Sequence, residues 1–218
     1  MKSRILSLAA LVLVAACSSQ PPTPAWQANA HDSLERFVTD YLKGDERSAG
    51  VEFDNARREV AATGDATMVA RAELTRCAVQ VASLAFEPCT GFEALRADSA
   101  APERAYADYI AGRVAPAEVA LLPPQHRGIA AGREDAGSLR AIADPAARLV
   151  AAGVLLRTGR ASPEVLQVAV DTSSQQGWRR PLLSWLGVQA QRAEHAGQHD
   201  VAERIRRRMD LVSGQATH

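Results

Sequence analysis

The chain has 218 residues, with 25 basic and 25 acidic side chains and a formal net charge of zero. This balance argues against a general nucleic-acid binder, which needs a basic surface. Aromatic residues make up only 5% of the chain, and alanine is frequent. Because alanine is the best helix former and no continuous Val/Ile/Thr strands occur, we predict an all-α protein with a single globular domain.

The first residues have the pattern of a secretory signal peptide. Lys2 and Arg4 supply positive charge, and an apolar run of about twelve residues follows them. A helix that spans a bilayer needs roughly 20 residues, so the run is too short for a membrane span. We therefore predict a cleaved signal peptide at residues 1–16.

The end of this segment, Val14-Ala15-Ala16-Cys17, resembles the lipobox of bacterial lipoproteins. The resemblance implies that Cys17 becomes the N-terminal residue and carries fatty acyl chains such as palmitate. In that family an aspartate after the cysteine often signals inner-membrane retention, so Ser18 implies an outer-membrane anchor with the protein facing the periplasm. Two or more acyl chains hold a protein at a membrane without a transmembrane helix. The alternative is an ordinary cleaved signal with a chance cysteine.

A proline-rich segment follows the predicted lipidation site. Residues 17–30 contain three prolines and few groups that a core would bury, so we predict an extended tether. Trp26 in this segment either docks on the domain or lies among lipid headgroups. One helical domain is predicted at residues 31–218, and its first helix is expected to be capped by Asp32 and to stop at Gly44.

Two more amphipathic helices are predicted next, joined by a short turn at Gly64 that favours an antiparallel hairpin. Cys77 lies on the apolar face of the helix that follows Gly64. Cys89 lies further along the chain, directly after Pro88. With Cys17 lipidated, these two cysteines form an even pair in an oxidising compartment, so we predict one intrachain disulfide. Twelve residues of unbroken helix would span roughly 18 Å, so the chain must turn back, and Pro88 is where a helix cannot continue. The alternative is two free buried thiols.

Residues 111–137 are weakly patterned, with several glycines, and functional loops are expected here if the chain has any. His126 and Arg127 lie in this stretch. A pocket joining them to a carboxylate would suit an envelope enzyme that acts on cell-wall material. No nucleophile elbow or Ser-x-x-Lys motif accompanies them, so we predict no catalytic residue and expect a surface or capping role for His126.

Four helices are predicted in residues 145–214, arranged as two helix-turn-helix units that begin at Pro145 and Pro181. A period in the thirties is typical of helical-hairpin solenoids. The segment 197–202 resembles the central turn of a tetratricopeptide repeat, although Arg206 stands where a large apolar residue is usual. The resemblance implies antiparallel helical hairpins with a solenoid-like, protein-binding surface, and the alternative is a compact helical bundle.

Two patches of this C-terminal part are candidate partner-binding surfaces. A tryptophan beside two arginines is typical of an interface hot spot, and an arginine cluster on the last helix would contact anionic lipid or an acidic partner. A solvated helix face is the alternative for the cluster. The predicted binding residues are Trp178, Arg179, Arg180, Arg204, Arg207 and Arg208.

The chemical motifs of common cofactor sites are missing from the sequence. His195 and His199 are four residues apart, but Gly197 interrupts the helix between them, so we predict no metal site. Glycine patterns for phosphate or dinucleotide binding do not occur, and no cofactor is expected. The sequence thus favours a periplasm-facing scaffold that binds another envelope protein. A cell-wall enzyme and a purely structural lipoprotein are the alternatives.

Overall fold

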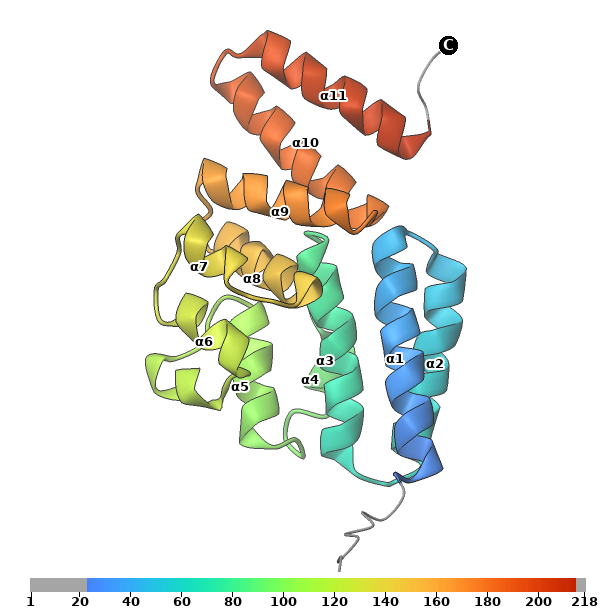
Figure 1. Ribbon diagram of the computed structural model, residues 1–218. Coiled ribbons are helices and arrows are strands. Elements are labelled where there is room, and N and C mark those ends of the chain that lie inside the picture. The colour runs from blue at the N-terminus through green and yellow to red at the C-terminus, as the bar shows by residue number, and fades with distance from the viewer. Residues whose placement is uncertain (1–22, 215–218) are drawn as a thin grey trace, which may run out of the picture.

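A computed structural model describes residues 23–214 (Figure 1). Every regular element in this range is a helix, which confirms the all-α prediction. In chain order the elements are α1 (Ala25–Lys43), α2 (Glu46–Ala61), α3 (Ala66–Ala82), α4 (Thr90–Glu93), α5 (Ala101–Ile110), the 3₁₀ helix η1 (Pro116–Leu121), α6 (Pro124–Ala130), α7 (Ala136–Arg140), α8 (Pro145–Arg157), α9 (Pro163–Gln175), α10 (Arg179–His195) and α11 (His199–Ser213).

Several helix boundaries follow capping residues in the sequence. Asp144 and Ser162 accept hydrogen bonds from the backbone N–H groups at the starts of α8 and α9. Asp45 and Asp65 do the same for α2 and α3. Gly44 ends α1 in the left-handed conformation, with φ of 87°.

The first helix begins earlier than the sequence predicted. It starts at Ala25, directly after Pro24, so residues 25–30 are helical and do not belong to a tether. Asp32 lies inside the helix and does not cap it. Proline suits the N-terminal boundary because its ring fixes φ and the missing N–H is not needed there. The rest of the predicted tether, Cys17 and the signal peptide lie outside the described residues.

Helix α3 occupies the centre of the fold (Figure 1), and α1, α2, α4, α5 and α8 pack against it. Ten of its 17 residues are buried, and four of these are alanines, so neighbouring helices approach closely. Helix α8 comes close to the backbone of α3 itself. A Cβ atom added at Gly153 would lie 2.4 Å from the carbonyl oxygen of Val81. Nearby, the buried indole of Trp185 on α10 donates to the carbonyl oxygen of Ala82 at 3.1 Å.

The Cys77–Cys89 disulfide is present, with the two Cα atoms 5.7 Å apart. The chain does turn back between the cysteines, but not at Pro88. Helix α3 ends at Ala82, and Leu84 adopts a left-handed conformation with φ of 62°. The turn is therefore made by backbone geometry several residues before the proline.

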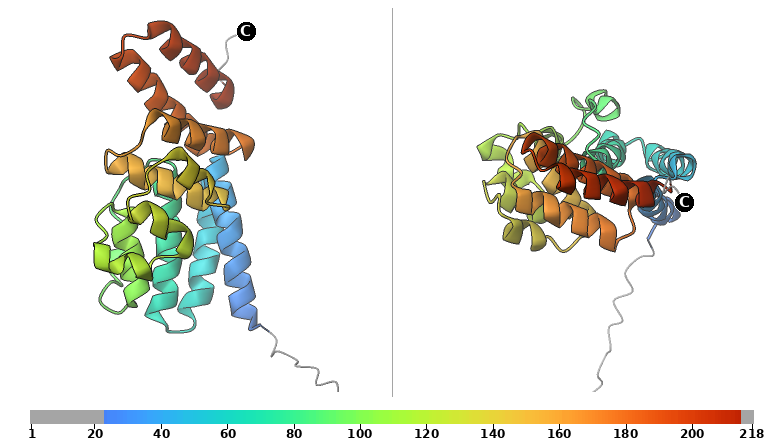
Figure 2. Two further views of the ribbon diagram at one scale, coloured as in Figure 1. Left: turned by 60° about the vertical axis from the view of Figure 1, so that its left-hand side comes forward. Right: turned by 90° about the horizontal axis from the view of Figure 1, so that it is seen from above.

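Helices α9, α10 and α11 follow one another away from the body of the molecule (Figure 2). Helices α10 and α11 form a hairpin that projects beyond the rest, and α11 packs mainly on α10. The N-terminal end of α1 lies at the opposite end of the molecule (Figure 1). Helix α10 begins at Arg179 and not at Pro181, because proline is tolerated within the first turn of a helix. Within residues 23–214 no helix combines the length and apolarity that crossing a bilayer requires.

The contact at Gly153 generates a stability prediction. We expect Gly153→Ala to lower the free energy of unfolding by about 1–3 kcal/mol, because the added methyl group must push α8 away from the α3 backbone. The matched control is Gly187→Ala on α10, where the nearest atom to an added Cβ is 3.9 Å away. That change should stabilise the protein by up to about 1 kcal/mol through helix propensity. Urea unfolding followed by circular dichroism measures both, and equal effects would contradict the close contact.

Candidate functional site

A cavity of about 570 Å³ opens between α3, α5, η1, α6 and α8. Its walls are mostly apolar and its mouth carries prolines. Short helices build one side of it: η1 and α6 begin at prolines, and Leu122 and Ile129 anchor them in the core. Residues 111–137, expected to be loops, therefore contain ordered short helices. The apolar lining residues are Val38, Leu74, Ala78, Val79, Pro102, Leu121, Leu122, Pro123, Pro124, Ala146, Ala147 and Val150.

Two carboxylates line this cavity together with two arginines. Glu103 on α5 is buried and accepts a hydrogen bond at Oε1 from Nε of Arg71 at 2.6 Å, while its Oε2 is buried without a partner. Asp144 is exposed, and its Oδ1 accepts the backbone N–H of Ala147 at the start of α8. Arg127 is exposed and donates from Nε to the carbonyl oxygen of Leu122 at 2.8 Å. Arg71 is thus compensated by a carboxylate, whereas Asp144 and Arg127 are not ion-paired within residues 23–214.

An aromatic cluster lies beside these charges. The ring of His126 is 5.6 Å from that of Tyr106 and 4.9 Å from that of Tyr109, centroid to centroid. His126 is only 2% exposed, and its Nδ1 has no hydrogen-bond partner. Burial lowers the pKa of His126 to about 4, against the smaller opposing effect of Asp144. The imidazole is therefore neutral at physiological pH.

Tyr106 belongs to both the aromatic cluster and the cavity wall. Burial raises the pKa of Tyr106 well above its ordinary value, and the negative charge of Asp144 raises it further. Tyr106, His126 and Asp144 all line the cavity, and the charge of Asp144 acts on the pKa of both other groups. The phenol stays protonated and offers an aromatic face and a hydroxyl group.

The residues of this site suit the binding of a ligand better than the cleavage of a covalent bond. No serine or cysteine is among the described residues that line the cavity. The hydroxyl of Thr75 donates to the carbonyl oxygen of Arg71, so it is not positioned as a nucleophile by His126. The arrangement provides apolar walls, two carboxylates, exposed guanidinium groups and a neutral histidine. Such walls with a few converging polar groups are typical of ligand-binding pockets.

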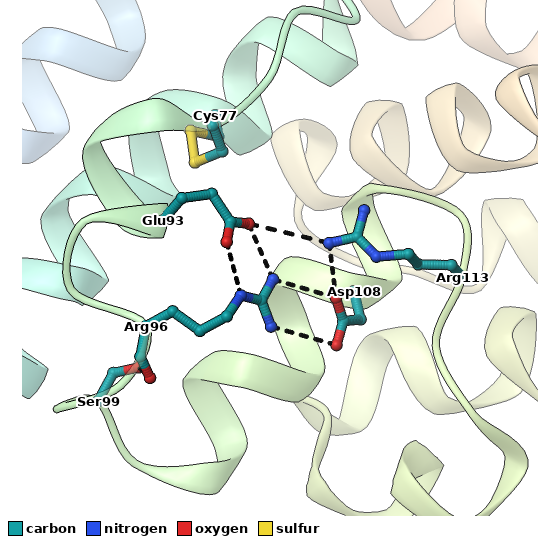
Figure 3. Close-up of polar contacts among 7 residues, drawn as sticks. Cys77, Glu93, Arg96, Ser99, Asp108 and Arg113 are labelled. Atoms are coloured by element: carbon teal, nitrogen blue, oxygen red, sulfur yellow. Dashed lines mark hydrogen bonds and ion pairs between the residues drawn. A yellow bond between two sulfur atoms is a disulfide. The ribbon is translucent and has the colours of Figure 1, made fainter.

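A second polar cluster lies next to the disulfide (Figure 3). Arg96 donates to both oxygens of Glu93, at 2.7 and 2.9 Å, and to Asp108 on α5 at 3.1 Å. Arg113 contacts the same Asp108 at 2.8 Å. The hydrogen bond from Arg96 holds the pKa of Glu93 below its usual range. The two carboxylates and the two guanidinium groups pair with one another here. The cluster therefore holds α4 against α5 and leaves no unpaired charge for a ligand.

Residues of the predicted patch around Trp178 mostly contact other helices of this chain. Trp178 is only partly exposed and packs against the main core, so it is not a free anchor. Arg180 donates to the carbonyl oxygen of Tyr41 at 2.8 Å and to Glu46 at 2.9 Å, and its guanidinium lies over the Tyr41 ring. Arg179 is exposed beside this contact. The two arginines thus lie where α10 meets α1 and α2.

The arginines predicted on the last helix lie on α11, away from the cavity. Arg204, Arg207 and Arg208 are exposed. Arg208 donates to the hydroxyl of Ser174 at 3.3 Å, and Arg207 is 3.9 Å from Glu203. The structure brings none of these residues to the cavity.

Neither of the histidines considered as metal ligands joins a metal-binding group. His195 is exposed, and Nδ1 of His199 lies 2.9 Å from Glu194. Across the part of the chain that the structure describes, no three His, Cys, Asp or Glu side chains are grouped as metal ligands would be.

Sequence reasoning identified His126 and Arg127 but missed the other polar groups of the cavity. Arg71 and Glu103 are 32 residues apart, and no local pattern links them. No local pattern marks Asp144 as a cavity residue either. No protein-family model, no curated protein and no solved structure matches this chain.

The lowered pKa of His126 predicts a pH-dependent stability. The unfolded chain takes up the proton near pH 6.5 and the folded chain only near pH 4, so folding is destabilised as the pH falls through this interval. We expect the unfolding free energy of the wild type, relative to His126→Gln, to fall by about 2 kcal/mol between pH 7 and pH 4.5. Urea unfolding at both pH values measures the difference. A constant difference would mean that the histidine is not buried as a neutral group.

Proposed function

We propose that this chain is a periplasm-facing lipoprotein, anchored through Cys17, whose helical domain binds another protein of the cell envelope. The binding site in this proposal is the cavity between α3, α5, η1, α6 and α8. The single observation that carries it is a mostly apolar cavity of about 570 Å³ into which several polar groups converge. A segment of a partner protein would bury apolar side chains there and meet the charged groups at the mouth.

Buried polar atoms support a binding role. Oε2 of Glu103 and Nδ1 of His126 are buried without partners, and both residues line the cavity. An unsatisfied buried polar group costs about 1–3 kcal/mol. Solvent does not reach either atom in the free chain, so the cost would be reduced only by a partner whose hydrogen-bonding groups reach these atoms.

An envelope enzyme is the second candidate, because His126, Arg127 and carboxylates do line one cavity. The residues of the cavity do not supply the groups that such an enzyme needs. A hydrolase needs an activated nucleophile or an accessible base, and His126 is 2% exposed with no serine or cysteine beside it in the described lining. Binding requires only the groups that the structure provides, so we rank it first.

If Cys17 is the anchor, the arginines of α11 are more suited to contact a protein partner than a lipid surface. Five residues separate Cys17 from Thr23 and span at most roughly 18 Å. The N-terminal end of α1 would then face the membrane, and the α10–α11 hairpin lies at the far end of the molecule (Figure 1). Arg204 and Arg207 would point toward the periplasm, where an acidic protein surface can reach them.

The anchor is tested by Cys17→Ser. We expect the wild-type chain to fractionate with outer membranes and the variant to lose this attachment, because it has no sulfur to form the thioether with diacylglycerol. Mass spectrometry of the N-terminal peptide should show acyl chains on Cys17 in the wild type. An unmodified thiol at this residue, or a mature chain that begins elsewhere, would contradict the proposal.

The binding site is tested by photo-crosslinking in intact cells. Leu121 lines the cavity and is 39% exposed, whereas Val51 on α2 is 56% exposed and lies outside it. We expect a photoreactive residue at position 121 to give one crosslinked envelope protein, and the same residue at position 51 to give none. Ala147→Phe, which fills part of the cavity, should abolish the adduct. An adduct that persists in this variant, with its melting temperature unchanged, would exclude the cavity as the site.

A further inference from the structure

We propose that the cavity accepts a lysine side chain of the partner protein, an aliphatic stem that ends in a primary ammonium group. This inference rests on the proposed function, because it names the chemistry of the segment that the cavity binds. Charges, an aromatic face and apolar walls surround this one space.

The first support is an unpaired acidic group at the cavity. Oδ1 of Asp144 caps α8, whereas Oδ2 makes no hydrogen bond and the carboxylate joins no ion pair within residues 23–214. A carboxylate with a free oxygen at the edge of an apolar cavity attracts a cation more strongly than one in open water, because the surrounding dielectric is lower. Asp144 is therefore the expected partner of the ammonium group.

The second support comes from Glu103. Arg71 engages only Oε1, and Oε2 is buried without a partner although the side chain is only 7% exposed. The pair is neutral overall, but it leaves one carboxylate oxygen without a hydrogen bond on the α5 wall of the cavity. An anionic ligand would be repelled by the unpaired charge of Asp144. A purely apolar ligand would desolvate Asp144 without compensation.

The aromatic cluster fits a cation as well. Tyr106 lines the cavity and is partly exposed, and the face of a tyrosine ring attracts an ammonium group by about 0.5–2 kcal/mol. His126 is neutral at physiological pH and does not repel a positive charge. Arg71 is compensated by Glu103, which leaves Arg127 as the one uncompensated cation among the described lining residues.

The rest of the cavity matches the remainder of a lysine-bearing peptide. Leu74, Ala78 and Val150 provide an apolar channel for the four methylene groups of the side chain. Gln125 and Arg127 are exposed at the rim, where their N–H groups can donate to backbone carbonyl oxygens of an extended segment. This feature favours a protein segment over a free alkylamine.

The test uses three probes and the purified mature chain. The probes are an acetylated, amidated pentapeptide of alanines with a central lysine, the same peptide with norleucine in place of lysine, and n-pentylamine. Binding is followed by NMR chemical-shift changes. We expect the lysine peptide to bind at least fivefold more tightly than both other probes, with shifts centred on Leu74, Tyr106 and Leu121.

A matched pair of variants removes charge without removing a helix cap. Asparagine caps helices as well as aspartate does, so Asp144→Asn should keep the fold and lower the affinity for the lysine peptide to that for the norleucine peptide. Asp135 caps α7 outside the cavity, so Asp135→Asn should change nothing.

Each remaining outcome decides against part of the proposal. If the lysine and norleucine peptides bind the cavity equally, the preference for an amine is wrong while the binding function stands. If n-pentylamine binds as tightly as the lysine peptide, the ligand is a small amine and not a protein segment. If no probe shifts residues of the cavity, both the inference and the proposed binding site fail.

Discussion

The close packing of α8 against α3 positions both the cavity and the disulfide. Gly153 allows the two helices to approach within the space of a single methyl group. One face of α3 then contributes Leu74 and Ala78 to the cavity, and another carries Cys77 to the disulfide. Because α8 contributes Val150 to the facing wall, the α3–α8 spacing sets the width of the cavity.

Helix α5 separates the cavity from the disulfide region and is held on both sides. Arg71 pairs with Glu103 on the cavity side, and Arg96 pairs with Asp108 on the other side, next to the disulfide (Figure 3). Partly exposed ion pairs of this kind contribute little stability individually. Here they fix the position of α5, which carries Tyr106, and they leave one oxygen of Glu103 without a hydrogen-bond partner.

Local features of the sequence predicted most helices, and long-range features escaped it. Asp144, Ser162 and Gly44 mark boundaries by capping chemistry that acts within a few residues. The early start of α1 was missed because the prolines before Ala25 resemble a tether. The pocket was expected only at His126 and Arg127, and Arg71 and Glu103 were missed because they lie 32 residues apart in sequence. The contacts of the Trp178 patch within the chain were missed for the same reason, since Arg180 pairs with Glu46, 134 residues away.

In the proposed function, the cavity holds a segment of an envelope protein in the cell. Hydrogen exchange of the mature chain, measured by mass spectrometry in isolated envelopes and again after purification, would reveal this occupancy. We expect backbone amides in residues 116–130 to exchange more slowly in envelopes, while those of α2 exchange equally in both samples. Identical exchange of residues 116–130 in the two samples would mean that no partner occupies the cavity.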